Sequence, residues 1–284
     1  KNILARCARE MYTFDPNPDD ISRDNLMRQS IELIAKFPTI IAYAYNIYRH
    51  SVQGRSLHIR HPRENLSIAE NFLYMMKHEN YSELDARMLD LLLIIQAEHG
   101  GGNNSTFTGR VTSSLHGGAN IKVINMFHHL KEAIKDWGNV TELDTYLKRM
   151  LNKEAYDKTG LIYGIGHAVY TLSDPRAVEL KRLAGELAKE KGREDEYNFL
   201  KLIEQEGIKC LQEHRGGSKP ACANLDFYSG FIYEMIGLPQ EIYTPIFAMA
   251  RIVGWTDHRI EELNFEGHRN IRPAYKNILG ELEI

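Results

Sequence analysis

Histidines flanked by glycines occur where one predicted helix gives way to the next. His99 is followed by three glycines, His116 by two, and His167 directly follows a Gly-Ile-Gly string. Asp226 stands at the start of another predicted helix. Imidazole and carboxylate groups are the side chains that most often move protons in catalysis, and loops between rigid elements usually present them. These junctions therefore hold the candidate acid and base groups.

Each junction also has a structural explanation, because histidine beside glycine can end a helix and aspartate is a favoured N-cap residue. Three sharper alternatives fail. His-Gly-Gly-Gly (99–102) matches the oxyanion loop of lipases, but the sequence has no GxSxG nucleophile elbow. No HExxH pair is present, and we predict no metal site. The Gly164-x-Gly166 pair lacks the third glycine and the preceding strand of a dinucleotide-binding loop.

The elements that must position these residues are helices. Apolar residues recur at helical spacing, and the period-2 alternation of strands is hard to find. The spacing predicts helices over residues 24–50, 65–78, 82–95, 120–137, 175–187, 196–211, 226–236 and 243–262. Pro38 should break or kink the first of these, and Asp174-Pro175 should open the fifth as N-cap and N1. The predicted fold class is all-α.

Composition limits the class of protein. The chain has 284 residues, 43% hydrophobic and 26% charged, as in ordinary globular proteins. Its 35 basic and 38 acidic residues give a net charge of −3, which argues against a nucleic-acid partner. No apolar run of about 18 residues is present, so we expect no membrane contact. Three scattered cysteines without a CxxC pair indicate a reducing compartment, and we expect a cytoplasmic protein.

Five strings together resemble the citrate synthase family, which includes 2-methylcitrate synthase. In order, they are His-Gly-Gly-Gly-Asn-Asn-Ser-Thr-Phe-Thr (99–108), His-Gly-Gly-Ala-Asn (116–120), Gly-Ile-Gly-His-Ala-Val-Tyr through Asp-Pro-Arg (164–176), Asn-Leu-Asp-Phe-Tyr-Ser-Gly (224–230) and Phe-Ala-Met-Ala-Arg-Ile-Val-Gly-Trp (247–255). The resemblance implies a multi-helical two-domain fold. A small domain over residues 118–237 would be inserted between the two parts of a large domain, residues 1–117 and 238–284.

The activity that this resemblance implies is that of an acyltransferase of the tricarboxylic acid cycle. Acetyl-CoA would condense with oxaloacetate, and hydrolysis would give citrate and CoA. Asp226 matches the base that takes a proton from the thioester methyl group, which is a very weak acid. His116 matches the stabiliser of the resulting enolate, favoured as a neutral imidazole by the helix that follows it. His167 matches the histidine that polarises and protonates the ketone of oxaloacetate.

Substrate contacts are implied in the same way. Oxaloacetate carries two carboxylates, which suit guanidinium groups, and the matching residues are His99, Arg176, Arg251 and Arg272. In the family the last arginine reaches the neighbouring subunit's site, which implies a homodimer. The coenzyme A thioester would be a co-substrate, with no tightly bound cofactor. The family's loop that holds coenzyme A matches Leu161, Gly164, Ile165 and Gly166. Lys219 is an added candidate for binding coenzyme A, because Thr171 stands where the family often has a basic residue.

The sequence departs from the family between His99 and His116. Only 16 residues separate them, whereas family members have a longer stretch that forms one more helix. The N-terminus is also shorter. Either residues are missing from the sequence here, or the protein lacks the helix. In the second case the alternative is a catalytically silent protein that binds CoA or a dicarboxylate. A second alternative is a 2-methylcitrate synthase that uses propionyl-CoA.

Overall fold

The computed structural model describes residues 6–8, 10–11, 14–98, 119–167, 170, 172–217 and 220–264. The helices are α2 (Arg23–Gln53), α3 (Ile68–Lys77), α4 (Glu83–Gln96), α6 (Ala119–Ala133), α7 (Val140–Leu151), α8 (Pro175–Glu190), α9 (Glu194–His214), α10 (Asp226–Met235) and α11 (Tyr243–Asn264), with a 3-10 helix η1 (Gln240–Ile242) before α11. Within the described residues, β-pairing is limited to one isolated antiparallel bridge between Ile165 and Ala223. The predicted all-α class is confirmed.

Short polar side chains set the starts of these helices. Ser67 and Ser82 open α3 and α4 with capping boxes, in which the serine hydroxyl accepts a bond from the N3 amide and the N3 carboxylate accepts one from the serine amide. Asn139 caps α7 in the simpler way, through its side-chain oxygen. Asp174 caps α8 and Pro175 occupies its first position, as predicted.

One expected helix break and one expected helix end were wrong. α2 runs without a break through Pro38, which is buried with Phe37 and Ile41. Proline removes one backbone donor, and the packing of α2 against α3 and α11 offsets that loss. The helix expected to reach residue 137 ends at Ala133. Trp137 lies in the following turn, stacked on Phe199 with ring centroids 5.2 Å apart.

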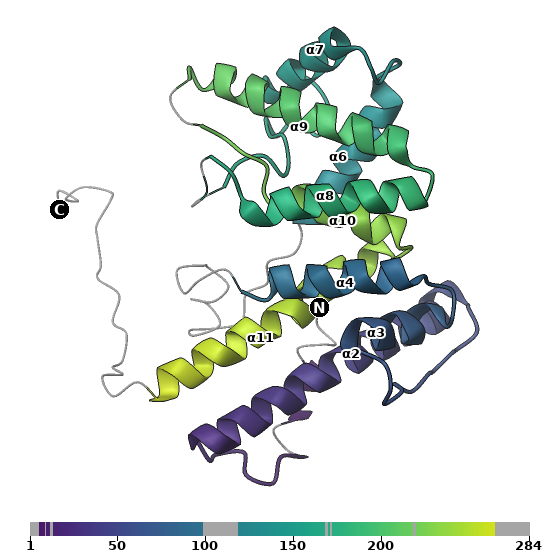
Figure 1. Ribbon diagram of the computed structural model, residues 1–284, viewed down its shortest axis with the longest axis vertical. Coiled ribbons are helices and arrows are strands. Elements are labelled where there is room, and N and C mark those ends of the chain that lie inside the picture. The colour runs from purple at the N-terminus through teal and green to yellow at the C-terminus, as the bar shows by residue number, and fades with distance from the viewer. Residues whose placement is uncertain are drawn as a thin grey trace, which may run out of the picture.

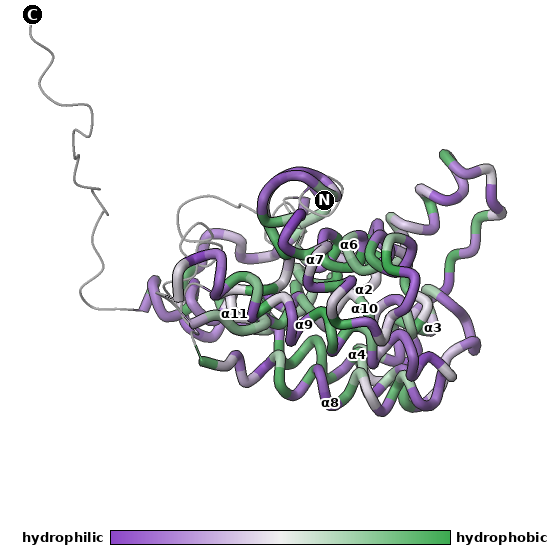
Figure 2. The backbone as a smooth tube through the Cα atoms, turned by 90° about the horizontal axis from the view of Figure 1, so that it is seen from above, coloured by the Kyte–Doolittle hydropathy of each residue, from purple (hydrophilic) through white to green (hydrophobic). Residues whose placement is uncertain are grey.

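The helices form two groups (Figure 1). α6 to α10 pack on one another, and so do α2, α3, α4 and α11. α4 also contacts α8 and α10, so it lies between the groups. Hydrophobic and hydrophilic residues alternate along the helices (Figure 2), as expected where each helix buries one side. In the described part of the chain, no helix combines the length and apolar character needed to cross a bilayer.

Polar bonds join the two groups near the first turn of α4 and at the end of α3. The Asp85 carboxylate lies 2.7 Å from Nζ of Lys191, which follows α8. Lys77 Nζ, at the end of α3, donates to the carbonyl of Ile236 at the end of α10, at 2.7 Å. The first bond holds one end of α4 to the end of α8 and the second joins α3 to α10, while Gln96 at the other end of α4 bonds to Arg251 and Tyr233.

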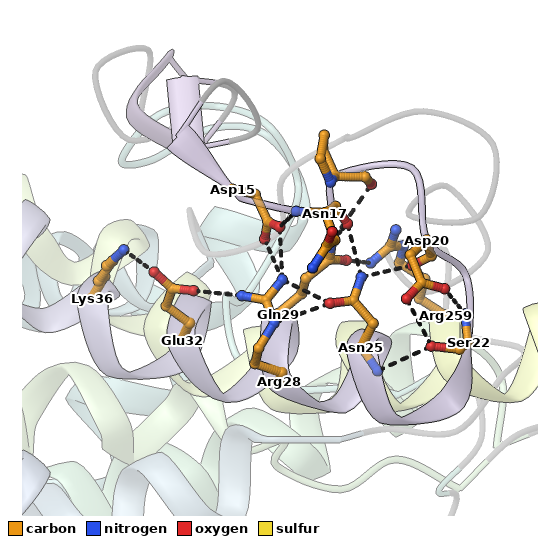
Figure 3. Close-up of polar contacts among 11 residues, drawn as sticks. Asp15, Asn17, Asp20, Ser22, Asn25, Arg28, Gln29, Glu32, Lys36 and Arg259 are labelled. Atoms are coloured by element: carbon orange, nitrogen blue, oxygen red, sulfur yellow. Dashed lines mark hydrogen bonds and ion pairs between the residues drawn. The ribbon is translucent and has the colours of Figure 1, made fainter.

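The segment before α2 is tied to the first turns of that helix (Figure 3). Arg28 Nη2 donates to both carboxylate oxygens of Asp15, at 2.7 and 2.8 Å, and to Asn25 Oδ1 at 2.7 Å. Arg259 of α11 donates to Gln29 Oε1 at 3.3 Å. This network fixes α2 against α11 and lies on helices that carry none of the predicted catalytic histidines.

Candidate active site

The structure describes the predicted site residues unevenly. His99, His116, Lys219 and Arg272 lie outside the described residues, and their roles stay predictions. The remaining predicted residues are described: His167, Asp226, Arg176, Arg251, Leu161, Gly164, Ile165 and Gly166. They come from the loop before α8, the first turns of α8 and α10, and the middle of α11.

Arg176 is held in one orientation by Asp174. The Asp174 side chain is buried, and its two oxygens accept bonds from Arg176 Nε and Nη2 at 3.0 and 2.9 Å. Burial alone would raise the pKa of Asp174, but the bonds and charge of Arg176 lower it. Arg176 Nη1 is buried and has no hydrogen-bond partner. One edge of the guanidinium is therefore fixed, and Nη1 can bind an anion.

His167 lies beside this arginine, with Nε2 3.4 Å from Arg176 Nη2. Its Nδ1 accepts a bond from the Tyr170 amide at 2.9 Å, so the proton of the neutral ring is assigned to Nε2. Burial lowers the pKa of His167. The positive charge of Arg176 lowers it further, and the negative charge of Asp174 acts in the opposite direction. With this tautomer the 3.4 Å contact joins two donors and is not a hydrogen bond, and an oxygen of a ligand that lies between them could accept from both.

The loop that carries His167 is paired with the segment before α10. Gly166 N–H donates to the Cys222 carbonyl at 2.7 Å, and Asn224 N–H donates to the Gly164 carbonyl at 2.9 Å. Gly164 has a φ of +81°, and a Cβ there would lie 2.8 Å from side-chain atoms of both Phe227 and Val123. The loop can therefore approach α6 and α10 only with glycine at this position.

Asp226 begins α10, and its backbone N–H donates to Asn224 Oδ1 at 3.0 Å. Its own Oδ1 is buried without a hydrogen-bond partner. Burial raises the pKa of Asp226 to about 6, although the positive charges of Arg176 and Arg251 pull it down. A carboxylate with a pKa this close to neutrality and no donor bonded to Oδ1 is suited to act as a general base.

Arg251 is almost fully buried, at 1% exposure, where α11 meets α4. Its Nε donates to the Gln96 carbonyl at 2.8 Å, and its guanidinium carbon lies 4.8 Å from the centroid of the Phe247 ring. Gln96 Oε1 accepts from the Tyr233 hydroxyl of α10 at 2.9 Å. The site therefore draws on helices from both groups.

A family model, the C-terminal domain of citrate synthase, matches residues 2–274 of the chain. The chain belongs to the citrate synthase family. The citrate synthase of Deinococcus radiodurans is 36% identical over 279 residues, which cover 91% of this chain and 67% of that protein. The Synechocystis citrate synthase is 34% identical over 254 residues, which cover 82% of this chain and 58% of the relative. The chain thus spans about two thirds or less of these relatives' length.

Solved citrate synthases share the fold. The citrate synthase of Pyrobaculum aerophilum has a TM-score of 0.75 at 27% identity, and the match covers 99% of this chain and 72% of that protein's chain. The citrate synthase of Thermoplasma acidophilum has a TM-score of 0.75 at 26% identity, and the match covers 99% of this chain and 74% of that protein's chain. The latter is a ternary complex with carboxymethyl coenzyme A and oxaloacetate. The citrate synthase resemblance of the sequence is confirmed.

Three residues of this citrate synthase fold were missed by sequence reasoning. Asn120 of α6 is fully buried, and neither polar atom of its side chain has a partner. Ser229 Oγ of α10 and Gln96 Nε2 of α4 are likewise buried without partners. Ser229 follows Asp226 by three residues and shares its helix face. Buried polar atoms are normally hydrogen-bonded, so in solution these atoms must bond to water or to a polar ligand.

Sequence signals for these residues were weak. Two of them lie inside the quoted strings, at the ends of 116–120 and 224–230. Single asparagine, serine and glutamine residues within helices carry no chemical motif of their own. Their burial, which the sequence pattern does not reveal, is what distinguishes them. Among the described residues, no group of three or more histidine, cysteine, aspartate or glutamate side chains is arranged to hold a metal ion.

Proposed function

We propose that the chain condenses acetyl-CoA with oxaloacetate and hydrolyses the resulting thioester to citrate and CoA. The observation that carries this proposal is the Asp226 carboxylate. Its Oδ1 is buried without a donor, its pKa is about 6, and the charges of two arginines act on it. A base for a very weak carbon acid needs this combination of high basicity and nearby anion-binding groups.

Oxaloacetate fits the described residues through its charged ends and its ketone. Arg176 Nη1 and the Arg251 guanidinium would bind the carboxylates. The ketone oxygen would accept from His167 Nε2. Asp226 would take a proton from the thioester methyl group, and the enolate carbon would form a bond to the ketone carbon. His167 would then pass its Nε2 proton to the ketone oxygen, which becomes the hydroxyl of the product.

The residues outside the described part keep their predicted roles in this proposal. His116 would stabilise the enolate oxygen, and His99 would help to bind oxaloacetate. Arg272 would complete the site of a neighbouring subunit in a homodimer. The backbone of residues 161–166, with Lys219, would hold coenzyme A. The grouping of α6 to α10 supports a small domain over residues 118–237 that closes on the rest of the chain and excludes water.

Cell location and metabolic role are part of the same proposal. We place the enzyme in the cytoplasm and in the tricarboxylic acid cycle, as an acyltransferase that needs no tightly bound cofactor. The relatives' name, citrate synthase, supports the metabolic role, and the three scattered cysteines without a CxxC pair support the location.

Release of free thiol from acetyl-CoA tests the activity. Release that requires oxaloacetate supports condensation, and release without oxaloacetate would indicate an acyl-CoA hydrolase instead. Binding of both compounds without release would identify a silent member of the family, the outcome expected if the helix between His99 and His116 is absent. Comparing kcat/KM for acetyl-CoA and propionyl-CoA separates the citrate from the 2-methylcitrate reaction, since one methylene changes binding by about 1–3 kcal/mol.

A further inference from the structure

Asn224 makes side-chain hydrogen bonds in two directions. Its Nδ2 donates to the carbonyl of Gly166, the residue before His167, at 3.0 Å. Its Oδ1 accepts from the backbone N–H of Asp226 at 3.0 Å. A single amide group therefore bonds to the loop of the candidate acid and to the candidate base itself.

We propose that Asn224 is a positioning residue that sets the separation between His167 and Asp226. This inference rests on the proposed condensation, in which the two residues act on opposite partners of the new carbon–carbon bond. Asp226 must reach the thioester methyl group while His167 reaches the ketone oxygen. A misplacement of about 1 Å can cost on the order of a hundredfold in rate, so the relative placement of these groups matters as much as their chemistry.

The surroundings explain why this residue carries the task. The Asp226 carboxylate has no partner at Oδ1, so the backbone at the start of α10 decides where that oxygen lies. The His167 loop is short, and its backbone bonds to 222–224 leave the amide of Asn224 as the side-chain link to Gly166. Both bonds use the plane of one amide, so movement of the loop is transmitted to the first turn of α10.

Two substitutions separate this role from simple support of the first turn of α10. Asn224→Asp keeps an oxygen to accept from the Asp226 amide but loses the donor to Gly166. Asn224→Ala loses both. We expect both variants to lower kcat by about tenfold or more, at pH 8, where Asp226 is ionised. The KM for oxaloacetate should change far less than kcat. The kinetic isotope effect with deuterated acetyl-CoA should increase, because proton abstraction becomes slower relative to the other steps.

Asn139 offers the matched control, because it has no predicted site role. Its Oδ1, like that of Asn224, accepts from a backbone N–H at the start of a helix, here that of Glu142 in α7 at 3.1 Å. Asn139→Asp and Asn139→Ala should leave kcat and the isotope effect unchanged. An Asn224→Asp variant with wild-type kcat would show that only the bond from the Asp226 amide matters. That result would overturn the inference. The inference would also be overturned if both Asn224 variants lost activity only in proportion to their unfolded fraction and kept the wild-type isotope effect.

Hydrogen–deuterium exchange provides a readout that needs no activity. In Asn224→Asp we expect faster exchange in residues 164–167 while the first turn of α10 stays protected. In Asn224→Ala both regions should exchange faster. Equal exchange in all three proteins would reject the coupling. A wild-type protein that releases no thiol refutes the proposed function instead, and the exchange experiment still decides whether Asn224 links the two segments.

Discussion

Replacing Asp226 with asparagine should stabilise the fold at neutral pH while it removes the activity. Burial raises the pKa of this carboxyl from its ordinary value of 3.8 to about 6. One pKa unit corresponds to about 1.4 kcal/mol, so the ionised carboxylate costs the folded state about 3 kcal/mol above pH 6. Asparagine has nearly the same shape and no charge, and it removes this cost.

The sign of the pH dependence follows from the direction of the pKa change. Because the folded-state pKa is raised, protonation favours the fold. The contribution is fully present below pH 3.8 and is lost as the pH rises through 6. Relative to Asp226→Asn, the wild-type protein should therefore lose roughly 2–3 kcal/mol of unfolding free energy between pH 4 and pH 8. Taking the difference between two pH values cancels the pH-independent effects of the new amide.

Urea unfolding at both pH values measures this difference. Asp90→Asn, on the exposed side of α4, is the matched control, and it should change stability by no more than about 0.5 kcal/mol. Thiol release by Asp226→Asn should fall below a tenth of the wild-type rate. If the variant and the wild type lose stability in parallel from pH 4 to pH 8, the carboxyl is not desolvated as described. A variant that keeps more than a tenth of the turnover would refute the assignment of Asp226 as the base.

Four further substitutions test the packing and the charge interactions of the fold. Gly164 and Gly192 both have positive φ, +81° and +64°, but only a Cβ at 164 would be crowded. Gly192→Ala should cost about 1 kcal/mol in urea unfolding and Gly164→Ala about 2–4 kcal/mol, and equal losses would contradict the packing. Gly254→Ala places a methyl group against the Ala97 carbonyl and the Glu98 carboxylate, next to His99. Turnover should fall by about tenfold or more with a native circular-dichroism spectrum, and unchanged turnover would refute that contact. Hydrogen bonds from Arg193 and Lys131, and the charges of these two residues, outweigh burial and lower the pKa of Glu196 from 4.5 to about 2. Glu196→Gln should therefore cost up to about 3 kcal/mol of unfolding free energy at pH 7. That cost, measured by urea unfolding, should shrink as the pH falls from 4.5 toward 2, and a pH-independent cost would argue against it.

Helix positions followed from the sequence because apolar periodicity reports which side of a helix is buried. The same signal did not reveal that α2 continues through Pro38 or that α6 ends at Ala133. Pro38 weakens a helix locally, but the packing of its buried neighbours depends on α3 and α11, which are distant in sequence. Trp137 continues an apolar stripe, yet it packs on Phe199 from a turn. Tertiary contacts decided both cases.

For the site, motif strings located the titrating groups but not their environment. His167 and Asp226 could be named as candidates from residue type and their place beside predicted helices, and Arg176 from the resemblance to the family. The donor-free Oδ1 of Asp226 and the orientation of Arg176 by Asp174 depend on burial and on bonds that no string encodes. Gln96 was passed over for the same reason, since its unpartnered Nε2 matters only because α4 lies between the two helix groups.

Four of the helices carry buried polar side-chain atoms that have no hydrogen-bond partner. They are Gln96 Nε2 of α4, Asn120 of α6, Arg176 Nη1 of α8, and Ser229 Oγ and Asp226 Oδ1 of α10. Leaving one such atom unsatisfied costs about 1–3 kcal/mol, and a whole protein is stable by only about 5–15 kcal/mol. In solution the donors among them must therefore bond to water or to a ligand, and a dicarboxylate supplies the acceptors they need. Asp226 has the opposite requirement, because a donor on its Oδ1 would lower the pKa that makes it a base. A ligand that occupies the donors and excludes water would satisfy both requirements, since it would leave the base without a donor just as its substrate arrives.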